Sequence, residues 1–254
     1  MPHTDITTID EVLTELDNII DATLGEGSPL GIFACVYRHT TAKIARGIEE
    51  NRFENATRME HFDVAFARLY IDAFWRHRDG EPVSFSWEVA FEAAENREVI
   101  IMQHLLLGMN AHINLDLGIA ASEVAPGDEI YGLEGDFMMI NTLLAELVDE
   151  MQQRISRVSP LMFLLDWIGK RNDEAVVNFS IAKARDFAWK FARNLAQAEE
   201  EARDQLIRRV DDQISSLGNL VAYPPGFLLP RVLSLIHYFE EKNMQKAIEV
   251  LNRE

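Results

Sequence analysis

The segment Ile100–Ala121, IIMQHLLLGMNAHINLDLGIAA, constrains the fold more than any other part of the chain. It is the most apolar long run in the sequence, yet it contains histidines, asparagines, a glutamine and an aspartate. Polar groups buried without partners cost roughly 1–3 kcal/mol each, so these side chains need partners inside the protein. Read as a helix, the segment has no solvent-like face, and such a helix is normally buried. We therefore expect a buried central helix that carries a polar site.

His112 and Asp116 are the most informative pair in this segment. At spacing i, i+4 they lie one helical turn apart on the same face. In one interpretation the carboxylate orients the imidazole for acid–base chemistry. In the other, both side chains bind one divalent metal ion together with ligands from another helix. His104 lies on the same stripe but ~12 Å from His112 along the helix axis, so a single ion holding both is marginal.

A purely structural interpretation of this segment is also open. Its polar side chains could form a satisfied buried network that only fixes how the helices pack. Gly108 costs ~1 kcal/mol against alanine inside a helix, and either close helix packing or room for a ligand explains it. A membrane span needs ~20 mostly apolar residues, and the polar side chains between Gln103 and Asp116 argue against one.

Helical periodicity continues along the rest of the chain, and we find no strand pattern, internal repeat or linker. The sequence therefore predicts an all-α fold, with residues 1–254 as a single domain. The expected architecture is a multi-helix bundle around the buried central helix. The first of the other predicted helices starts at residue 9, after a cap at Thr7–Thr8. Residues 172–217 are predicted as one long helix or two in line, before a cap at Gly218. The remaining predicted helices cover 32–51, 55–77, a short stretch from 86, 136–157, 160–168, 231–241, and a last helix ending near 252.

The helix expected over 55–77 places a carboxylate on its apolar face. Asp63 and Tyr70 both fall within the stripe of apolar residues that should pack against the core. A carboxylate in that position needs a cation, a hydrogen-bond donor or a metal. Asp63 is therefore our candidate for a group that meets the central helix, and an ion pair with Arg38 or Arg68 is the competing explanation.

Composition limits the classes of partner. The formal net charge is −18, from 42 acidic and 24 basic residues, and such a surface repels nucleic-acid phosphates and anionic membranes. The single cysteine, Cys35, lies in an apolar context and excludes a disulfide within the chain, which fits a reducing compartment. The N-terminal residues show no signal-peptide pattern, so we expect a cytoplasmic protein that does not bind nucleic acid.

The familiar catalytic motifs are missing from the sequence. We find no H-E-x-x-H zinc motif, no phosphate-binding glycine loop, no G-x-S-x-G nucleophile elbow and no E-x-x-H pair of the di-iron bundles. The sequence therefore offers a candidate site without naming a reaction, a substrate or an oligomeric state.

Three motifs resemble those of a family of functionally uncharacterised bacterial proteins. The first is the run L-L-L-G-M-N-A-H-I-N-L-D-L at Leu105–Leu117; the others are M-E-x-F-D-x-x-F-A-x-x-Y at Met59–Tyr70, with His61 in the third position, and S-W-E-V-A-F at Ser86–Phe91. The similarity covers roughly residues 30–122. It implies that the polar residues of the first motif occur together as a unit, and it implies no activity.

The leading hypothesis is an enzyme, a metal-assisted hydrolase built on the central helix. In this hypothesis His112 is the base or a metal ligand, and Asp116 orients the imidazole or binds the same ion. Asp63 supplies a catalytic group from the third helix. Substrate binding is assigned to four further polar residues: Asn110, Asn114, His104 and Tyr70. The alternative is a non-enzymatic helical scaffold, or a protein that binds a small molecule, in which the polar network is structural.

Overall fold

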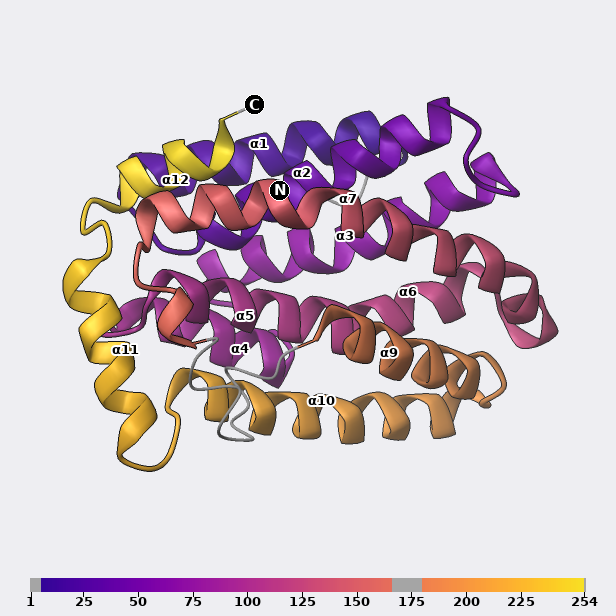
Figure 1. The fold of residues 1–254 in the computed structure, drawn as a ribbon. Coiled ribbons are helices and arrows are strands. Elements are labelled where there is room, and N and C mark those ends of the chain that lie inside the picture. The colour runs from indigo at the N-terminus through magenta and orange to yellow at the C-terminus, as the bar shows by residue number, and fades with distance from the viewer. Residues whose placement is uncertain (1–5, 166–179, 254) are drawn as a thin grey trace.

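The regular secondary structure in the described part of the chain is all helical, as the periodicity predicts (Figure 1). The computed structural model describes residues 6–165 and 180–253, and it contains no strand within those ranges. The α-helices are α1 Ile9–Glu26, α2 Gly31–Glu49, α3 Ala56–Arg78, α4 Phe85–Glu92, α5 Ile101–Ala111, α6 Leu117–Val124, α7 Glu134–Val158, α9 Ile181–Ala196, α10 Glu200–Ala222, α11 Leu228–Phe239 and α12 Met244–Asn252. Three shorter elements are η1 Ala93–Glu95, η2 His112–Asp116 and η3 Gly127–Leu133.

The central segment lies between two groups of helices, which explains why it is apolar on every side. In Figure 1, α5 and α6 run through the middle, with α1, α2, α3, α7 and α12 on one side and α4, α9 and α10 on the other. Contacts between the elements agree, because α5 packs against α2, α4 and α10, and α6 packs against α3 and α9. Helix α11 crosses one end of the bundle (Figure 1).

The N-terminal helices begin at the residues whose side chains can cap them. Thr8 and Glu11 form a reciprocal capping box at the start of α1, each side chain accepting a hydrogen bond from the other residue's backbone N–H. Asn55 caps α3 and Ser84 caps α4. These local signals are why the sequence locates the starts of these helices to within a residue or two.

The central helix departs from the regular α-helix expected over residues 100–121. Between α5 and α6 the chain makes one π-helical turn, His112–Asp116, before it continues as a helix to Val124. A π turn bonds residue i to i+5 and widens the helix locally, and such turns frequently occur at functional sites. An apolar pattern that covers every face carries no mark of this change, so the sequence could not reveal it.

The second half of the chain differs from the prediction in two places. Instead of one long helix or two in line, α9 and α10 form a hairpin whose buried faces pack on Leu115 of the central segment. Gly218 does not cap a helix; it lies inside α10, where an added Cβ would come within 3.1 Å of Val89 and 3.3 Å of the Asn110 side chain. Part of the helix predicted over 160–168, and the start of the one predicted from 172, fall outside the described residues.

Within residues 6–165 and 180–253, none of the helices has both the length and the apolar character that crossing a bilayer requires. This agrees with the expectation that the polar side chains of the central segment rule out a membrane span there. Cys35 is fully buried and free, and burial raises the pKa of its thiol to about 12, as expected for a cysteine that serves as a small core residue.

Candidate functional site

The π turn η2 holds His112 and Asp116 in the interior of the bundle. The two residues are 1% and 3% exposed, and Nδ1 of His112 lies 3.0 Å from Oδ2 of Asp116. The two side chains therefore meet as their spacing predicts, although within a π turn and not a regular α-helix. The imidazole and the carboxyl group form a direct pair inside the core.

Trp87 hydrogen-bonds to the same carboxyl group. Its indole Nε1–H donates to Oδ2 of Asp116 at 2.9 Å, and with Asp116 as a carboxylate this oxygen accepts from both neighbours. His112 then donates from Nδ1–H, and Nε2 of the neutral ring is left with its lone pair. Nε2 is enclosed by protein atoms and has no hydrogen-bond partner within the described residues. The site therefore presents an oriented, unpaired base.

Burial decides the charge of this pair. It lowers the pKa of His112 well below its usual value, because the imidazolium would lose its hydration. Burial also raises the pKa of Asp116, and the hydrogen bond from Trp87 opposes that rise. The neutral imidazole is thus the stable form of His112 at neutral pH, as a proton acceptor requires.

Aromatic rings enclose the imidazole. Phe66 lies parallel to it, with the ring centroids 3.6 Å apart, and Tyr37 meets it edge-on at 4.5 Å. Phe33, Tyr70 and Trp87 complete the enclosure at centroid distances of 5.7, 6.0 and 6.1 Å. The rings cover much of the imidazole, and His112 also forms part of the wall of the adjacent cavity.

A cavity of about 490 Å³ lies beside His112, between α2, α3, α7, α9 and the central segment. Its volume falls within the range of small-molecule pockets. The lining is mostly aliphatic and aromatic, and it includes a few polar groups that converge on the apolar space, among them Tyr37, Asp63, His112 and Arg185. A pocket of this composition suits a largely apolar molecule held by a few specific polar contacts.

Asp63 lines the same cavity from α3. It is 2% exposed, and its Oδ2 makes no hydrogen bond within the described residues. Burial, helped by the nearby charge of Glu60, raises the pKa of Asp63 to about 7. The alternative ion pair with Arg38 or Arg68 does not form: Arg38 pairs with Asp17, and no ion pair joins Asp63 to Arg68 in the described part of the chain.

Tyr37 connects the two carboxyl groups. Burial raises the pKa of Tyr37 well above its usual value, and the carboxyl groups of Asp63 and Asp116 both add to the rise. Both carboxyl groups are therefore close enough to Tyr37 for their charges to act on its phenol.

The two asparagines of the central segment face away from the cavity. Asn110 donates from Nδ2 to the backbone oxygen of Ile214 in α10 at 2.9 Å, and Asn114 donates to the side-chain oxygen of Asn110 at 3.1 Å. Neither lines the cavity beside His112. Their hydrogen bonds tie the central segment to α10, which is the structural role that the alternative interpretation assigns to them.

His104 and Tyr70 lie on the other side of Phe33. Both line a separate space of about 20 Å³ that also borders Gly108, and neither lines the large cavity. Burial lowers the pKa of His104 to about 4, so this histidine is also neutral. An added Cβ at Gly108 would come within 2.4 Å of Cγ of Phe33, so close packing explains this glycine.

The arrangement of the pair bears on the predicted metal ligands. His112 and Asp116 bond to each other, and an ion bound at that nitrogen and that oxygen would have to replace this hydrogen bond. In the described ranges, no three His, Cys, Asp or Glu side chains come together in a group that could hold a metal ion. The geometry is that of a carboxyl group orienting an imidazole.

Sequence reasoning missed Trp87 and Arg185 as parts of the site. Nothing in the local sequence of Trp87 links it to Asp116, which lies on another element. Arg185 had a visible signal, because it interrupts the small and apolar residues Ala184, Ala188 and Trp189 that form the buried face of α9. A cation in such a stripe must be buried with partners of its own.

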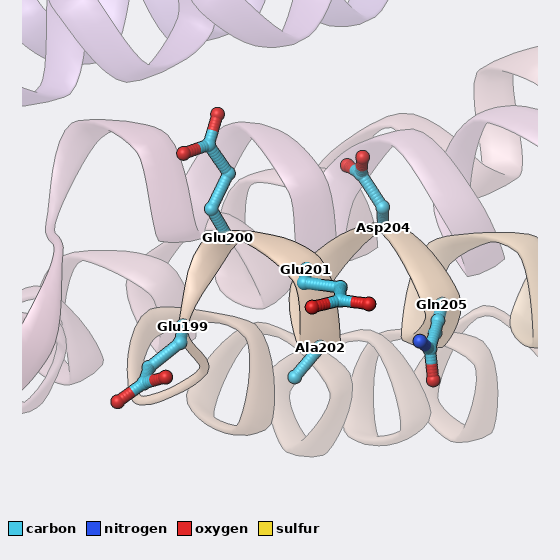
Figure 2. A pocket seen from close by; sticks show the side chains of 6 residues that line it. All are labelled: Glu199, Glu200, Glu201, Ala202, Asp204 and Gln205. Atoms are coloured by element: carbon cyan, nitrogen blue, oxygen red, sulfur yellow. The ribbon is translucent and has the colours of Figure 1, made fainter.

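A second hollow is formed by the acidic start of α10. Figure 2 shows Glu199, Glu200, Glu201 and Asp204 there, with side chains that point in different directions. Acidic side chains in the first turn of a helix interact favourably with the helix dipole. Their position at the start of α10 therefore explains this acidic cluster without a ligand.

Comparison with known proteins places the chain in one family. The model of a family of unknown function, DUF5995, matches residues 9–224. The resemblance seen over residues 30–122 therefore extends into the C-terminal half, to the end of α10. No curated protein and no solved structure matches the chain.

Proposed function

The chain belongs to the DUF5995 family of unknown function, and we propose that it binds a small, largely apolar organic molecule in the cavity beside His112. One observation carries this proposal. Nε2 of His112 is buried and unpaired, oriented by Asp116, at the wall of an apolar cavity of about 490 Å³. A ligand that donates a hydrogen bond to Nε2 would satisfy this atom.

The energetic argument concerns the free protein. A buried acceptor without a partner destabilises the folded protein by roughly 1–3 kcal/mol. A phenylalanine in place of His112 has no such acceptor and would avoid this cost. The chain instead supports the imidazole with Asp116 and Trp87, two further buried polar groups. A buried polar group without a partner, on a residue that lines an apolar cavity, is expected where a ligand binds.

Binding can be tested with dodecanol, which combines an apolar chain with one hydrogen-bond donor. We expect heat of binding in calorimetry with the wild-type protein, and none with Val36→Phe, because the added ring fills the cavity that Val36 lines. His112→Leu should weaken binding about tenfold, the effect of losing a hydrogen bond of ~1.4 kcal/mol. His61→Leu, an exposed position on α3, is the matched control and should bind as the wild type does. Equal binding by the wild type and Val36→Phe would refute the proposal.

A second candidate function is acid–base catalysis in the same cavity. It is favoured by the presence of two groups suited to opposite roles: His112 as a neutral base and Asp63, with a pKa of about 7, as a carboxylic acid that can donate a proton. In a hydrolase, Nε2 would take a proton from a water molecule as its oxygen attacks the carbonyl carbon of an ester, and Asp63 would protonate the leaving oxygen. The metal-assisted version of this enzyme would need a ligand set beyond the bonded pair His112–Asp116.

Hydrolysis is tested with dodecyl acetate. Alcohol release by the wild-type protein that is lost in both His112→Leu and Asp63→Asn, and kept in His61→Leu, is the result expected of an enzyme. Binding of dodecanol without any turnover would leave the protein as a binding protein only. Metal analysis of protein purified without chelator tests the metal-assisted version, which requires stoichiometric metal that is lost in His112→Leu.

A further inference from the structure

Arg185 is a buried cation in the wall of the cavity. It is 3% exposed and extends from α9, whose residue Ile181 also lines this space. Its Nε–H donates to the side-chain oxygen of Asn141, and its Nη2–H donates to the backbone oxygen of Phe137 at 2.6 Å. The guanidinium carbon also lies 4.4 Å from the centre of the Phe137 ring. Neutral groups thus hold Arg185 in a fixed orientation.

Arg185 makes no ion pair in the described part of the chain, although the charge of its neighbour Asp186 favours its charged form. Within residues 6–165 and 180–253, the ion pairs closer than 4.0 Å include none with Arg185. Its Nη1 makes no hydrogen bond in that part of the chain, and it is not among the atoms that protein fully encloses. Burial lowers the pKa of Arg185 to about 9, which still leaves it charged at neutral pH. An uncompensated buried charge is costly, by several kcal/mol.

We infer that the molecule bound in the cavity is an apolar acid, whose carboxylate pairs with the Arg185 guanidinium while its hydrocarbon part lies along the apolar wall. This inference rests on the proposed function and adds an acid group to its ligand, which keeps a hydroxyl donor for Nε2 of His112. An arginine presents its N–H groups in a planar fork that matches a carboxylate, and Asn141 and Phe137 leave Nη1 available for it.

The rest of the cavity is compatible with an anion at one position only. Asp63 lines the same space, and burial raises its pKa to about 7, so below that pH its neutral form predominates and does not repel the ligand. The neutral imidazole of His112 adds no charge. Arg185 is thus the charged group that sets the preference, and the surrounding apolar side chains accommodate the hydrocarbon.

The test compares dodecanoate and dodecanol, which share one hydrocarbon chain and differ in charge, by calorimetry at neutral pH. We expect the wild-type protein to bind dodecanoate at least about tenfold more tightly, the usual scale of a charge-assisted hydrogen bond. Arg185→Met keeps most of the side chain's length without its charge and should abolish this preference. Arg193→Met removes a cation from the exposed side of the same helix and should leave the preference unchanged.

The outcomes separate this inference from the proposed function. Equal binding of dodecanoate and dodecanol by the wild type would overturn the inference and leave the cavity as a binding site for neutral molecules. Binding of neither compound would refute both. If Arg185→Met fails to fold, the comparison of the two ligands on the wild-type protein still decides, and Arg185→Lys, which retains the charge, should retain the preference for dodecanoate.

Discussion

The ring of Phe66 lies flat against the imidazole of His112, with 3.6 Å between the ring centroids and 8° between the planes. One face of the imidazole is therefore covered by a residue of α3, and the π turn positions the other groups around it. A ligand in the cavity can reach this histidine only at the ring edge that carries Nε2. The stack also couples α3, which carries Asp63 one turn before Phe66, to the central segment.

Replacement of Phe66 by leucine should loosen this coupling. We expect the free energy of unfolding to fall by about 1–2 kcal/mol, because the stack is lost and the smaller side chain fills the space incompletely. Urea denaturation measures the change. Phe163→Leu is the control, since Phe163 is 60% exposed and should change stability little. Equal losses in both variants would show that the stack contributes nothing specific.

Asp116 should determine the tautomer of His112. In Asp116→Leu the carboxyl acceptor is gone, so Nδ1–H of His112 and Nε1–H of Trp87 lose their shared partner. We expect nitrogen NMR to show His112 protonated at Nδ1 in the wild type and released from that form in the variant. Stability should fall by about 1–3 kcal/mol for each donor left unpaired. Asp63→Leu, as control, should preserve the Nδ1–H form.

Asp63 should make the stability of the protein fall as pH rises toward neutrality. Its pKa is raised from 3.8 to about 7 in the folded state, so the folded state holds this proton more tightly than the unfolded chain does. The stabilising contribution is complete below about pH 4 and is lost between about pH 4 and pH 7, by an amount on the order of 4 kcal/mol.

The variant Asp63→Asn removes this titration. Relative to the wild type, its free energy of unfolding should rise progressively from pH 4 to pH 8 in urea denaturation. Glu92→Gln, which changes an exposed carboxylate on α4, should follow the wild-type profile. A wild-type profile that is unchanged by Asp63→Asn would contradict the raised pKa.

Gly108 should resist replacement by alanine although alanine favours helices by ~1 kcal/mol. The new Cβ would approach Cγ of Phe33 to 2.4 Å, and the Phe33 ring packs against Tyr70, Trp87 and His112. We expect Gly108→Ala to lower the melting temperature. Gly25→Ala, inside α1 with no atom within 4 Å of the added Cβ, should leave it unchanged or raise it. A stabilised Gly108→Ala would show that Phe33 moves freely.

Asn110 should act as a tether between helices and not as a ligand contact. Asn110→Ala removes its hydrogen bond to Ile214 and the acceptor of Asn114, and we expect a loss of about 1–3 kcal/mol in urea denaturation. Dodecanol affinity should stay at the wild-type level. Asn219→Ala, which removes an exposed bond within α10, is the control for stability. Weaker dodecanol binding by a folded Asn110→Ala variant would show that Asn110 contributes to ligand binding.

The sequence by itself determined the helical fold, the cap region at Thr7–Thr8, and the meeting of His112 with Asp116, because each depends on residues within about one turn of each other. It also indicated that Asp63 faces the core, since periodicity reports which side of a helix is buried. Only the tertiary structure decided what surrounds that pair. Trp87, Phe66 and Arg185 come from three other helices, and the π turn and the cavity arise where those helices pack, so no local pattern could specify them.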